Sequence, residues 1–399
     1  MSAKNILEDV RVVELSEALA GPHCAMLLGD LGADVVKIER PEVGDQSRGW
    51  GPPFVGSESA YFLGANRNKQ SVALNYDHPR GVEALRKLIG ASDIFICNQP
   101  SLASLKKRGI DPETLCEKHS RLIYCSITGY GFTGPNAGRP GYDILAQAEA
   151  GLMSITGEPD GGPMRYPIAI ADMTCGMYSA MAILAALYWR EKTGRGQFLD
   201  MALLDSQLTW LANVGSSYLN ANASPKRWGN AHPSVVPYEV FRGADGRSFV
   251  IGVGTEALWK KFVRMMGIEN GVGQDERFRT NALRNKNRAE LIPLLQCMFD
   301  GQTASVWMEQ LAAAQIPAAP INTVQEAVND PQTIARNMIV QLEHPALGVA
   351  RSIGNPIKFS ETPVSYRLPP PLLGEHTREV LRALGYSEEE VRAMSAAAI

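Results

Sequence analysis

One carboxylate in the sequence stands where a side chain could react. Asp172 lies between the apolar run at 168–171 and a helix of small residues that we predict from about 173 to 188. An Asp at a helix start is often only an N-cap, because its oxygens accept hydrogen bonds from the first backbone N–H groups. The same N–H groups can stabilise an ionised carboxylate, and carboxylates can act as covalent nucleophiles. Asp172 is therefore either a structural cap or a nucleophile that needs no base.

Basic residues that could hold an anionic ligand cluster after the predicted strands. In an open parallel sheet, ligands bind beyond the carboxyl ends of the strands, where Lys and Arg can meet phosphates. The set suits a polyphosphate ligand such as coenzyme A (CoA), although charges on solvated loops are the other interpretation. Its members are Lys37, Arg40, Arg67, Lys69, Lys106, Lys107 and Arg108.

The elements that must position these residues follow a βα pattern. Nearly continuous apolar runs at 10–15, 35–39, 71–74, 94–97 and 122–127 alternate with helical segments. Such runs are typical of strands buried on both faces of a parallel sheet. The sequence therefore predicts an α/β fold whose large domain is doubly wound and Rossmann-like. The turn at 16–22 lacks the G-x-G-x-x-G fingerprint, so we predict no nicotinamide dinucleotide.

A second domain is indicated where the composition changes after Trp210 and Asn, Ser and Gly become common. Two paired strands are predicted at 235–241 and 248–253, and helices at 257–266, 288–298 and 304–314. We predict a large α/β domain at 1–224, a smaller α+β domain at 225–325, and a C-terminal segment at 326–399 that returns to the large domain.

The composition argues against several classes of protein. With 39 basic and 42 acidic residues the net charge is −3, which predicts no nucleic-acid or anionic membrane partner. The six cysteines have no metal-ligand spacing, so no metal is predicted. The start lacks a leader pattern and no run of ~18 uninterrupted apolar residues occurs, so we expect a cytoplasmic protein. G-x-S-x-G is also absent, and His232, in a Gly/Asn loop, is either functional or a turn residue.

With these residues identified, the chain resembles the class III coenzyme A transferase family, which includes formyl-CoA transferase, carnitine CoA-transferases and the α-methylacyl-CoA racemases. The resemblance runs from about residue 10 to residue 376, nearly the whole chain. It is carried by LAGP at 19–22, DLGADVVKIERP at 30–41, NRNK at 66–69, GYD at 141–143, Asp172, KTGRGQ at 192–197 and PLLGEHT at 371–377.

The resemblance implies an enzyme that moves CoA between carboxylic acids, with Asp172 forming mixed anhydrides and an aspartyl-CoA thioester. It implies an interlocked homodimer, acyl-CoA and a carboxylic acid as the substrates, and no permanently bound cofactor. Backbone N–H groups in the loops around Leu19 and Gly229 are the candidates for stabilising oxyanions. The CoA site is expected at Leu19, Arg40, Asn66, Arg67, Asn68, Lys69, Asn98, Lys107, Tyr142 and Asp143.

Departures from the family pattern narrow the expected reaction. Glu17 stands where relatives often have a basic residue or His, and the segment at 227–238 replaces the glycine-rich lid of formyl-CoA transferase. The racemases have a His where this chain has Tyr142, which is a poor base near neutral pH, so we predict a transferase.

The chain looks most like the branch that acts on succinyl-CoA with dicarboxylates such as glutarate or hydroxymethylglutarate. Alternatives are a racemase-like enzyme, a CoA-binding protein without turnover, and CoA transfer to carnitine, citramalate or oxalate. The far carboxylate of a dicarboxylate needs a cation, for which Arg67, Arg165 and Arg227 are candidates, and Glu17 and His232 are candidate substrate contacts.

Overall fold

The structure is a computed structural model that describes residues 5–99 and 101–395; residues 1–4, at the start for which no leader is predicted, lie outside the described part. The chain divides into two compact units. Unit 1 comprises Met1–Met153, Arg165–Ala223 and Pro331–Ile399, and unit 2 comprises Ser154–Met164 and Ser224–Asp330. The domain boundaries at 224 and 325 stay a prediction; Ser154–Met164, which they assign to the large domain, belongs to unit 2.

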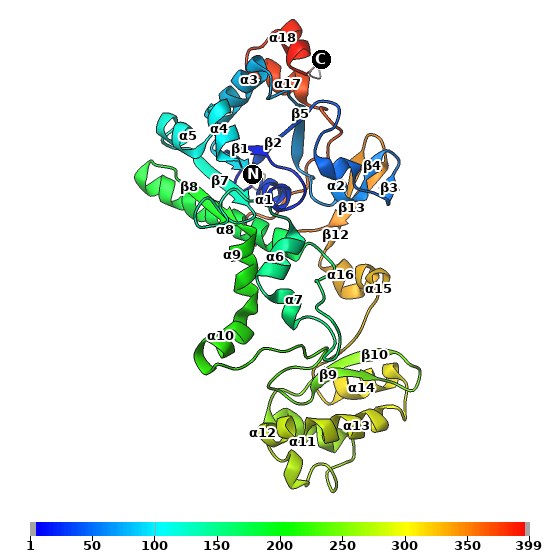
Figure 1. Cartoon of the computed structure of the whole chain (residues 1–399). Helices are drawn as coiled ribbons and strands as arrows, with labels where there is room; N and C mark the ends of the chain where they lie inside the picture. The colour runs from blue at the N-terminus through cyan, green and yellow to red at the C-terminus, as the bar shows by residue number, and fades with distance from the viewer. Residues whose placement is uncertain (1–4, 100, 396–399) are drawn as a thin grey trace. The chain divides into compact units, whose positions relative to one another are not determined.

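Unit 1 is built on a six-stranded parallel sheet with the order β5-β2-β1-β6-β7-β8 (Figure 1). The chain runs outward from β1 to β5 and then returns to continue on the other side of β1, so the strand order reverses between β1 and β6. This arrangement confirms the predicted doubly wound α/β fold, while β8 was not predicted. The strands are β1 (Arg11–Leu15), β2 (Asp34–Glu39), β5 (Lys69–Ala73), β6 (Ile94–Cys97), β7 (Ile123–Thr128) and β8 (Phe198–Ala202).

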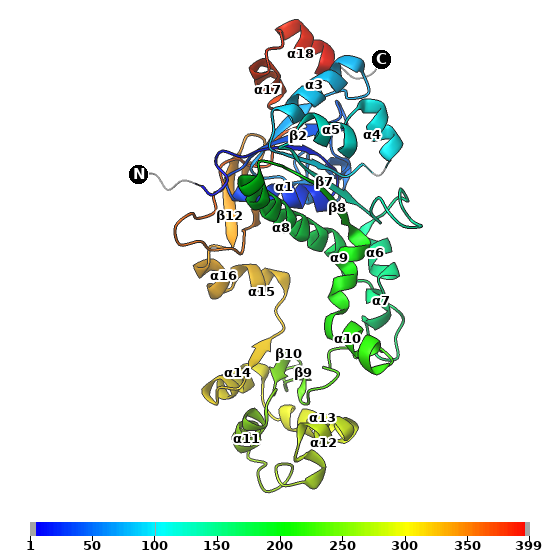
Figure 2. The same cartoon turned by 90° about the vertical axis from the view of Figure 1, so that its left-hand side faces the viewer.

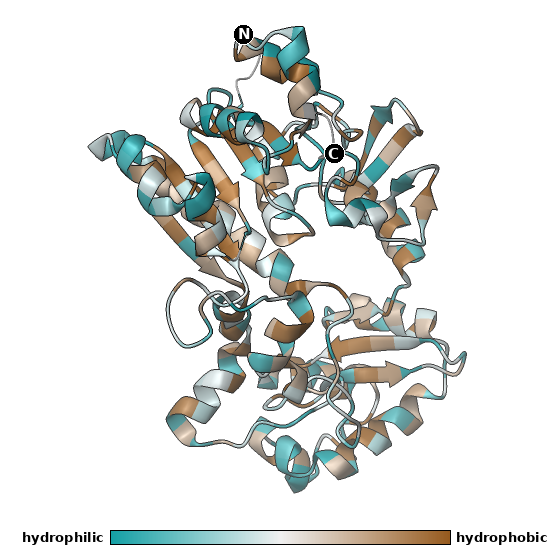
Figure 3. Ribbon diagram, turned by 45° about the horizontal axis from the view of Figure 1, so that its top comes forward, coloured by the Kyte–Doolittle hydropathy of each residue, from teal (hydrophilic) through white to brown (hydrophobic). Residues whose placement is uncertain are grey.

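Helices cover both faces of this sheet, as Figure 2 shows. Successive strand residues point to opposite faces, so Val12 packs in one core and Val13 in the other, and neither is exposed to solvent. Burial on both faces favours apolar residues, which are common in the strands (Figure 3), although β2 and β5 also contain buried charged residues such as Lys37 and Lys69. One core contains α1 (Ala20–Asp30) and α8 (Ile170–Thr193), and the other contains α3 (Pro79–Gly90), α4 (Leu102–Arg108), α5 (Pro112–Lys118), α17 (Thr377–Ala383) and α18 (Glu388–Ser395).

The C-terminal segment returns to the edge strand β5. The N–H of His376 donates to the carbonyl of Ser71 at 2.9 Å, and the Thr377 hydroxyl accepts from the N–H of Ala73 at 2.9 Å. The shorter elements of unit 1 are β3 (Phe54–Val55), β4 (Glu58–Ser59), α2 (Ala60–Leu63), α6 (Asp143–Glu149), α9 (Leu203–Leu208), α10 (Ala212–Ala221), α16 (Pro331–Ala335), β12 (Ile339–His344) and β13 (Gly348–Ile353), while α7 (Leu152–Ile155) crosses into unit 2.

Unit 2 is a smaller α+β body with an antiparallel sheet of order β11-β10-β9. Its core is centred on Phe299, whose ring lies 4.8 Å from that of Phe241 and 5.1 Å from that of Trp307. The predicted strand pair and helices are present, and β11 was not predicted. The elements are β9 (Tyr238–Arg242), β10 (Ser248–Gly252), β11 (Ala318–Pro320), α11 (Glu256–Met265), α12 (Asn281–Lys286), α13 (Arg288–Phe299), α14 (Ala304–Ala313) and α15 (Val324–Asn329).

Helix α8 is long and apolar enough to cross a membrane by length and composition, with 24 residues and a mean hydropathy of 1.5 in its most apolar window. Half of that window is buried inside the protein, because α8 packs on α1 beneath the sheet. A core helix has the same length and composition, so these properties are weak evidence for a membrane span. Its other face exposes an apolar stripe formed by Met177, Met181, Leu184 and Tyr188.

Candidate active site

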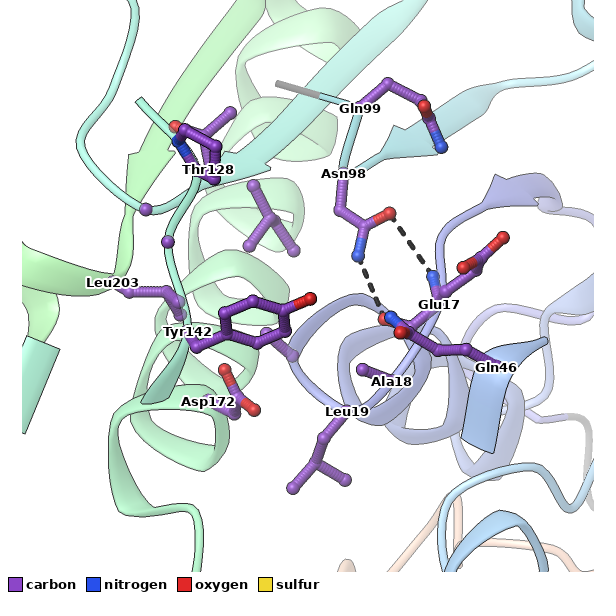
Figure 4. A pocket seen from close by; sticks show the side chains of 15 residues that line it. Glu17, Ala18, Leu19, Gln46, Asn98, Gln99, Thr128, Tyr142, Asp172 and Leu203 are labelled. Atoms are coloured by element: carbon purple, nitrogen blue, oxygen red, sulfur yellow. Dashed lines mark hydrogen bonds between the residues drawn. The ribbon is translucent and has the colours of Figure 1, made fainter. Parts of the chain in front are cut away.

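A pocket of about 230 Å³ lies at the carboxyl ends of β1, β6 and β7 (Figure 4). Because the strand order reverses between β1 and β6, this is the point at which an open α/β sheet leaves a crevice for a ligand. Loops from several strands therefore converge here. The lining residues are Glu17, Ala18, Leu19, Ala20, Gln46, Asn98, Gln99, Ile127, Thr128, Gly129, Pro140, Gly141, Tyr142, Asp172 and Leu203.

Asp172 lines this pocket from the first turn of α8 (Figure 4). The helix begins at Ile170, and its N-cap residue is Ala169. The predicted helix start at about 173 was therefore wrong, and so was the interpretation of Asp172 as the N-cap. The N–H of Ala171 is instead bonded by a carboxylate of another helix, because it donates to Asp143 Oδ1 at 2.8 Å. The Asp172 carboxyl group is left available to the pocket.

Burial, and to a smaller extent the neighbouring Asp143 carboxylate, together raise the pKa of Asp172 to about 7. From its place near a helix start, Asp172 was expected to be stabilised in the ionised form. The loss of hydration outweighs that effect, because a buried carboxylate is disfavoured against its neutral form. Near neutral pH the group is present as both acid and carboxylate, and only the carboxylate is a nucleophile.

Asp143 positions Asp172. It is the first residue of α6, and its Oδ2 atom accepts a hydrogen bond from Gln147 Nε2 at 2.7 Å. The side-chain oxygen of Gln147 in turn accepts from the N–H of Tyr166 at 2.8 Å. Together with the bond to Ala171, these contacts connect α6, the segment before α8 and the first turn of α8. Asp143 was predicted to contact CoA, whereas its neighbour Tyr142 is the residue that lines the pocket.

The loop after β1 forms the wall that faces Asp172 (Figure 4). It leads from Glu17 to Leu19, the N-cap residue of α1, and no side chain caps that helix. The N–H groups at the start of α1 are therefore available at the pocket, where a helix N-terminus favours negative charge. Glu17 also lines the pocket, and burial, followed by the nearby Asp45 carboxylate, raises its pKa.

Arg40 and Lys107, two predicted CoA contacts, belong to a second basic region. Arg40 pairs with Asp77 at 2.5 Å and lies over the ring of Tyr76, 4.6 Å from its centroid. Lys107 lines a pocket of about 610 Å³ together with Tyr76, Asp77 and Arg108. Arg108 also pairs with Asp77, so the two arginines share one carboxylate. The structure thus brings these cations together.

The predicted ligand segment at 66–69 is enclosed in the fold. Arg67 and Lys69 are at most 1% exposed. Arg67 forms a two-point contact with Asp30, at 2.9 and 2.6 Å, and Lys69 pairs with Glu14 at 2.9 Å. Asn66 accepts a hydrogen bond from Lys69, and the side-chain amide of Asn68 donates to Asp30. These groups satisfy one another inside unit 1, and a direct contact with CoA or a substrate carboxylate would require them to leave these partners.

The three remaining substrate candidates are not among the pocket-lining residues. Arg165 is exposed in unit 1. Arg227 belongs to unit 2, where its guanidinium donates to the carbonyls of Glu158 at 3.2 Å and Gly161 at 2.6 Å. His232, also in unit 2, accepts the N–H groups of Ser234 and Val235 at Nδ1. These contacts lie within its own turn, so they support the interpretation of His232 as a turn residue.

Several pocket residues were not identified from the sequence. Gln99 lies just after β6, and Thr128 is the last residue of β7. A polar residue at the end of a buried strand is a signal that could have indicated both. Gln46 carries no comparable signal, because it begins a short 3-10 helix, η1 (Gln46–Gly49), away from the end of a strand. Leu203 was missed together with strand β8, which it follows.

Comparison with known proteins identifies the family of this chain. The model of CoA-transferase family III matches residues 7–377. Succinyl-CoA:glutarate CoA-transferase of Mus musculus is 41% identical, over 96% of this chain and 87% of the relative, and succinate–glutarate CoA-transferase of Agrobacterium fabrum is 41% identical, over 95% of both. The crystal structure of a CAIB/BAIF family protein from Brucella suis has a TM-score of 0.85 at 41% identity, over 95% of this chain and 99% of that protein.

The chain belongs to CoA-transferase family III. It is a class III CoA-transferase, so acyl-CoA thioesters and carboxylic acids are its substrates. The prediction of the enzyme class is confirmed.

Proposed function

We propose that this enzyme transfers CoA from succinyl-CoA to a dicarboxylate, with glutarate as the first acceptor to test, through covalent intermediates on Asp172. The observation that most directly supports this proposal is the position of Asp172, which lines the pocket at the strand-order reversal and faces the start of α1. The two named relatives, each 41% identical over almost the whole chain, support the choice of donor and acceptor.

The cycle begins when the Asp172 carboxylate attacks the thioester carbonyl of succinyl-CoA. The C–S bond breaks, giving a mixed anhydride and CoA thiolate. The thiolate then attacks the Asp172 carbonyl, which releases succinate and leaves an aspartyl-CoA thioester. The acceptor carboxylate attacks that thioester, and the thiolate released attacks the acceptor carbonyl, so Asp172 is restored. Each step exchanges bonds of similar energy, so positioning and charge stabilisation are the main tasks of the protein.

The start of α1 supplies the charge stabilisation. Leu19 and Ala20 line the wall opposite Asp172 at the start of α1, and a negative charge that develops on a carbonyl oxygen between this wall and Asp172 would meet the positive end of the helix. Gly229, the other predicted source of N–H groups, belongs to unit 2 and forms no part of the described lining.

The phosphates of CoA are assigned to the basic region beside Tyr76. Arg86, Lys107 and Arg108 line the pocket there and Arg40 pairs with its carboxylate, Asp77, so four positive charges meet one negative charge among these residues. Charged hydrogen bonds from such groups to phosphate oxygens are among the strong ones available to proteins.

The far carboxylate of the acceptor needs a cation from outside the pocket lining. Among the described residues of that lining, none is Lys or Arg, while Gln46, Gln99 and Tyr142 provide neutral donors. Arg165 remains the candidate, because the contacts of Arg67 and of Arg227 commit both guanidinium groups to the fold. We also propose a cytoplasmic homodimer, in which the exposed apolar stripe of α8 is covered by a second copy.

The first test is intact mass spectrometry of the protein after mixing with succinyl-CoA. Hydroxylamine or borohydride traps the intermediate, and peptide mapping locates it, with Asp172→Asn as the control. We expect a modification at Asp172 in the wild type alone, and turnover with glutarate that exceeds turnover with carnitine, citramalate or oxalate. An unmodified protein that binds CoA, or one that only exchanges the α-proton of an acyl-CoA, would refute the proposal.

A further inference from the structure

Ala18 holds an unusual backbone conformation in the wall that faces Asp172. Its φ is 69°, in the left-handed region that residues with a Cβ atom rarely adopt and glycine adopts readily. Leu19 and Ala20 follow directly, so the conformation of Ala18 decides where the N–H groups at the start of α1 point. Contacts from the surrounding fold must therefore hold this residue.

Two side chains hold the loop at successive residues. Asn98 clamps the backbone of Glu17, because its Oδ1 atom accepts the Glu17 N–H at 3.2 Å and its amide donates to the Glu17 carbonyl at 2.9 Å (Figure 4). Asp45 Oδ1 accepts the N–H of Ala18 itself at 3.1 Å. Asn98 thus fixes the peptide before Ala18, and Asp45 fixes the strained residue.

Asp45 is itself fixed by a buried network. Its Oδ1 atom accepts from the N–H and the hydroxyl of Ser47, at 2.8 and 2.7 Å. Its Oδ2 atom lies 2.9 Å from the ammonium group of Lys37, and both side chains are fully buried. Lys37 also donates to the carbonyl of Ser16 at 2.7 Å, so the ion pair meets the loop at Ser16 and at Ala18.

The ion pair is poorly explained as a source of stability alone. Lys37 also pairs with the buried Glu14 at 3.0 Å, so the fold keeps a partner for Lys37 without Asp45. Burying charges costs hydration free energy that their attraction roughly offsets, so the further pair with Asp45 adds little net stability. Asp45 does, however, provide an acceptor for the N–H of Ala18. The position of the Asp45 carboxylate, next to the wall that faces the nucleophile, gives that acceptor a role in the site.

We propose that Asp45 is a positioning residue of the transfer reaction, which accepts the Ala18 N–H and so directs the N–H groups of Leu19 and Ala20 toward the carbonyl carried by Asp172. The inference rests on the proposed role of Asp172 as the nucleophile. Asp45 is absent from the pocket lining and acts only through the loop.

The test compares Asp45→Ala and Asp45→Asn with Asp111→Ala in the full-length enzyme. Asp111 is an equally buried carboxylate that accepts the N–H of Thr114 at the start of α5. In Asp45→Ala we expect kcat to fall about 10- to 100-fold while KM for succinyl-CoA changes less than about 2-fold, because the loss falls on the transition state. Asp111→Ala should leave both constants within about 2-fold. Equal effects in Asp45→Ala and the control would overturn the proposal.

A rescue variant separates positioning from a general loss of packing. Glycine adopts the left-handed conformation unaided, so Ala18→Gly combined with Asp45→Ala should recover at least about 3-fold of the lost kcat. No recovery would show that Asp45 does not act through the conformation of Ala18.

Hydrogen exchange at 16–20 gives a readout that needs no turnover. We expect faster exchange there in Asp45→Ala and unchanged exchange in Asp111→Ala. Asp45→Asn keeps the size of the side chain but offers a weaker, neutral acceptor, so it replaces Asp45→Ala if that variant does not fold. We expect Asp45→Asn to lower kcat about 3- to 10-fold and to speed exchange at 16–20. Unchanged values of both overturn the proposal. Failure of the wild type to become modified at Asp172 would instead refute the proposed function, and the exchange would still decide the role of Asp45.

Discussion

Replacing Asp172 by Asn should stabilise the fold while it abolishes transfer. Folding raises the pKa of this carboxyl group from an ordinary 3.8 to about 7, mainly through burial. At ~1.36 kcal/mol for each pKa unit, the ionised group costs the folded state up to ~4 kcal/mol above pH 7. Asp172 keeps some contact with solvent, so we expect about half of that value.

The sign follows from the direction of this pKa change. Between pH 4 and pH 7 the unfolded chain has lost this proton and the folded protein still holds it, so the wild type loses stability as the pH rises through this range. Asn carries no charge in either state. The stability gained in Asp172→Asn should therefore grow from pH 4 to pH 7 and remain constant above.

Urea unfolding at pH 5 and at pH 8 measures this difference. Asp111→Asn is a control for which the expected change in stability has the opposite sign. Burial alone would raise the pKa of Asp111, but hydrogen bonds from Thr114 lower it overall. Removing that carboxylate should therefore destabilise the protein at both pH values. If Asp172→Asn gains the same stability at pH 5 and pH 8, or loses stability at pH 8, the reasoning about the buried carboxyl group is wrong.

Three further outcomes test other parts of the site. The rate of covalent modification of Asp172, measured by stopped flow, should rise with pH through about 7. Asp143→Asn removes a negative charge but keeps an acceptor for the helix start, so it should move that rise to lower pH. A pH profile that Asp143→Asn does not move would exclude the effect of the Asp143 charge. Arg40→Ala and Arg108→Ala should each raise KM for succinyl-CoA about 10-fold with little change in kcat, and an effect on kcat alone would contradict a phosphate contact. Met181→Glu should shift the protein from dimer to monomer in light scattering, whereas a wild type that is already monomeric would refute the dimer.

The sheet was predictable from the sequence because burial on both faces leaves a strong signal. Each of the five predicted runs lies within one or two residues of a strand. Strand β8 was missed because its burial alternates, with Phe198 exposed and Ala202 buried at its two ends. Such a short alternating run does not stand out from the end of the long helix before it.

The site was predicted only in part, because burial of polar groups cannot be read from residue types. Asp172 and Asn98 were predicted and line one pocket, whereas Arg67 and Lys69 resemble ligand contacts in the sequence and lie inside the fold. A charged residue after a strand can face a ligand or a buried partner such as Asp30, and the partner lies far away in the sequence. The same limit explains why Asp45 was not identified.

The pocket walls come from separate loops, and this arrangement allows substrate choice to change by small evolutionary steps. Gln46, Gln99 and Tyr142 each reach the pocket from a different connection, and none belongs to either core of unit 1. A substitution at one of them can reshape the acceptor side without disturbing the sheet or the helix that carries Asp172. A small library at these three positions would therefore sample new acceptor acids at little cost in folding.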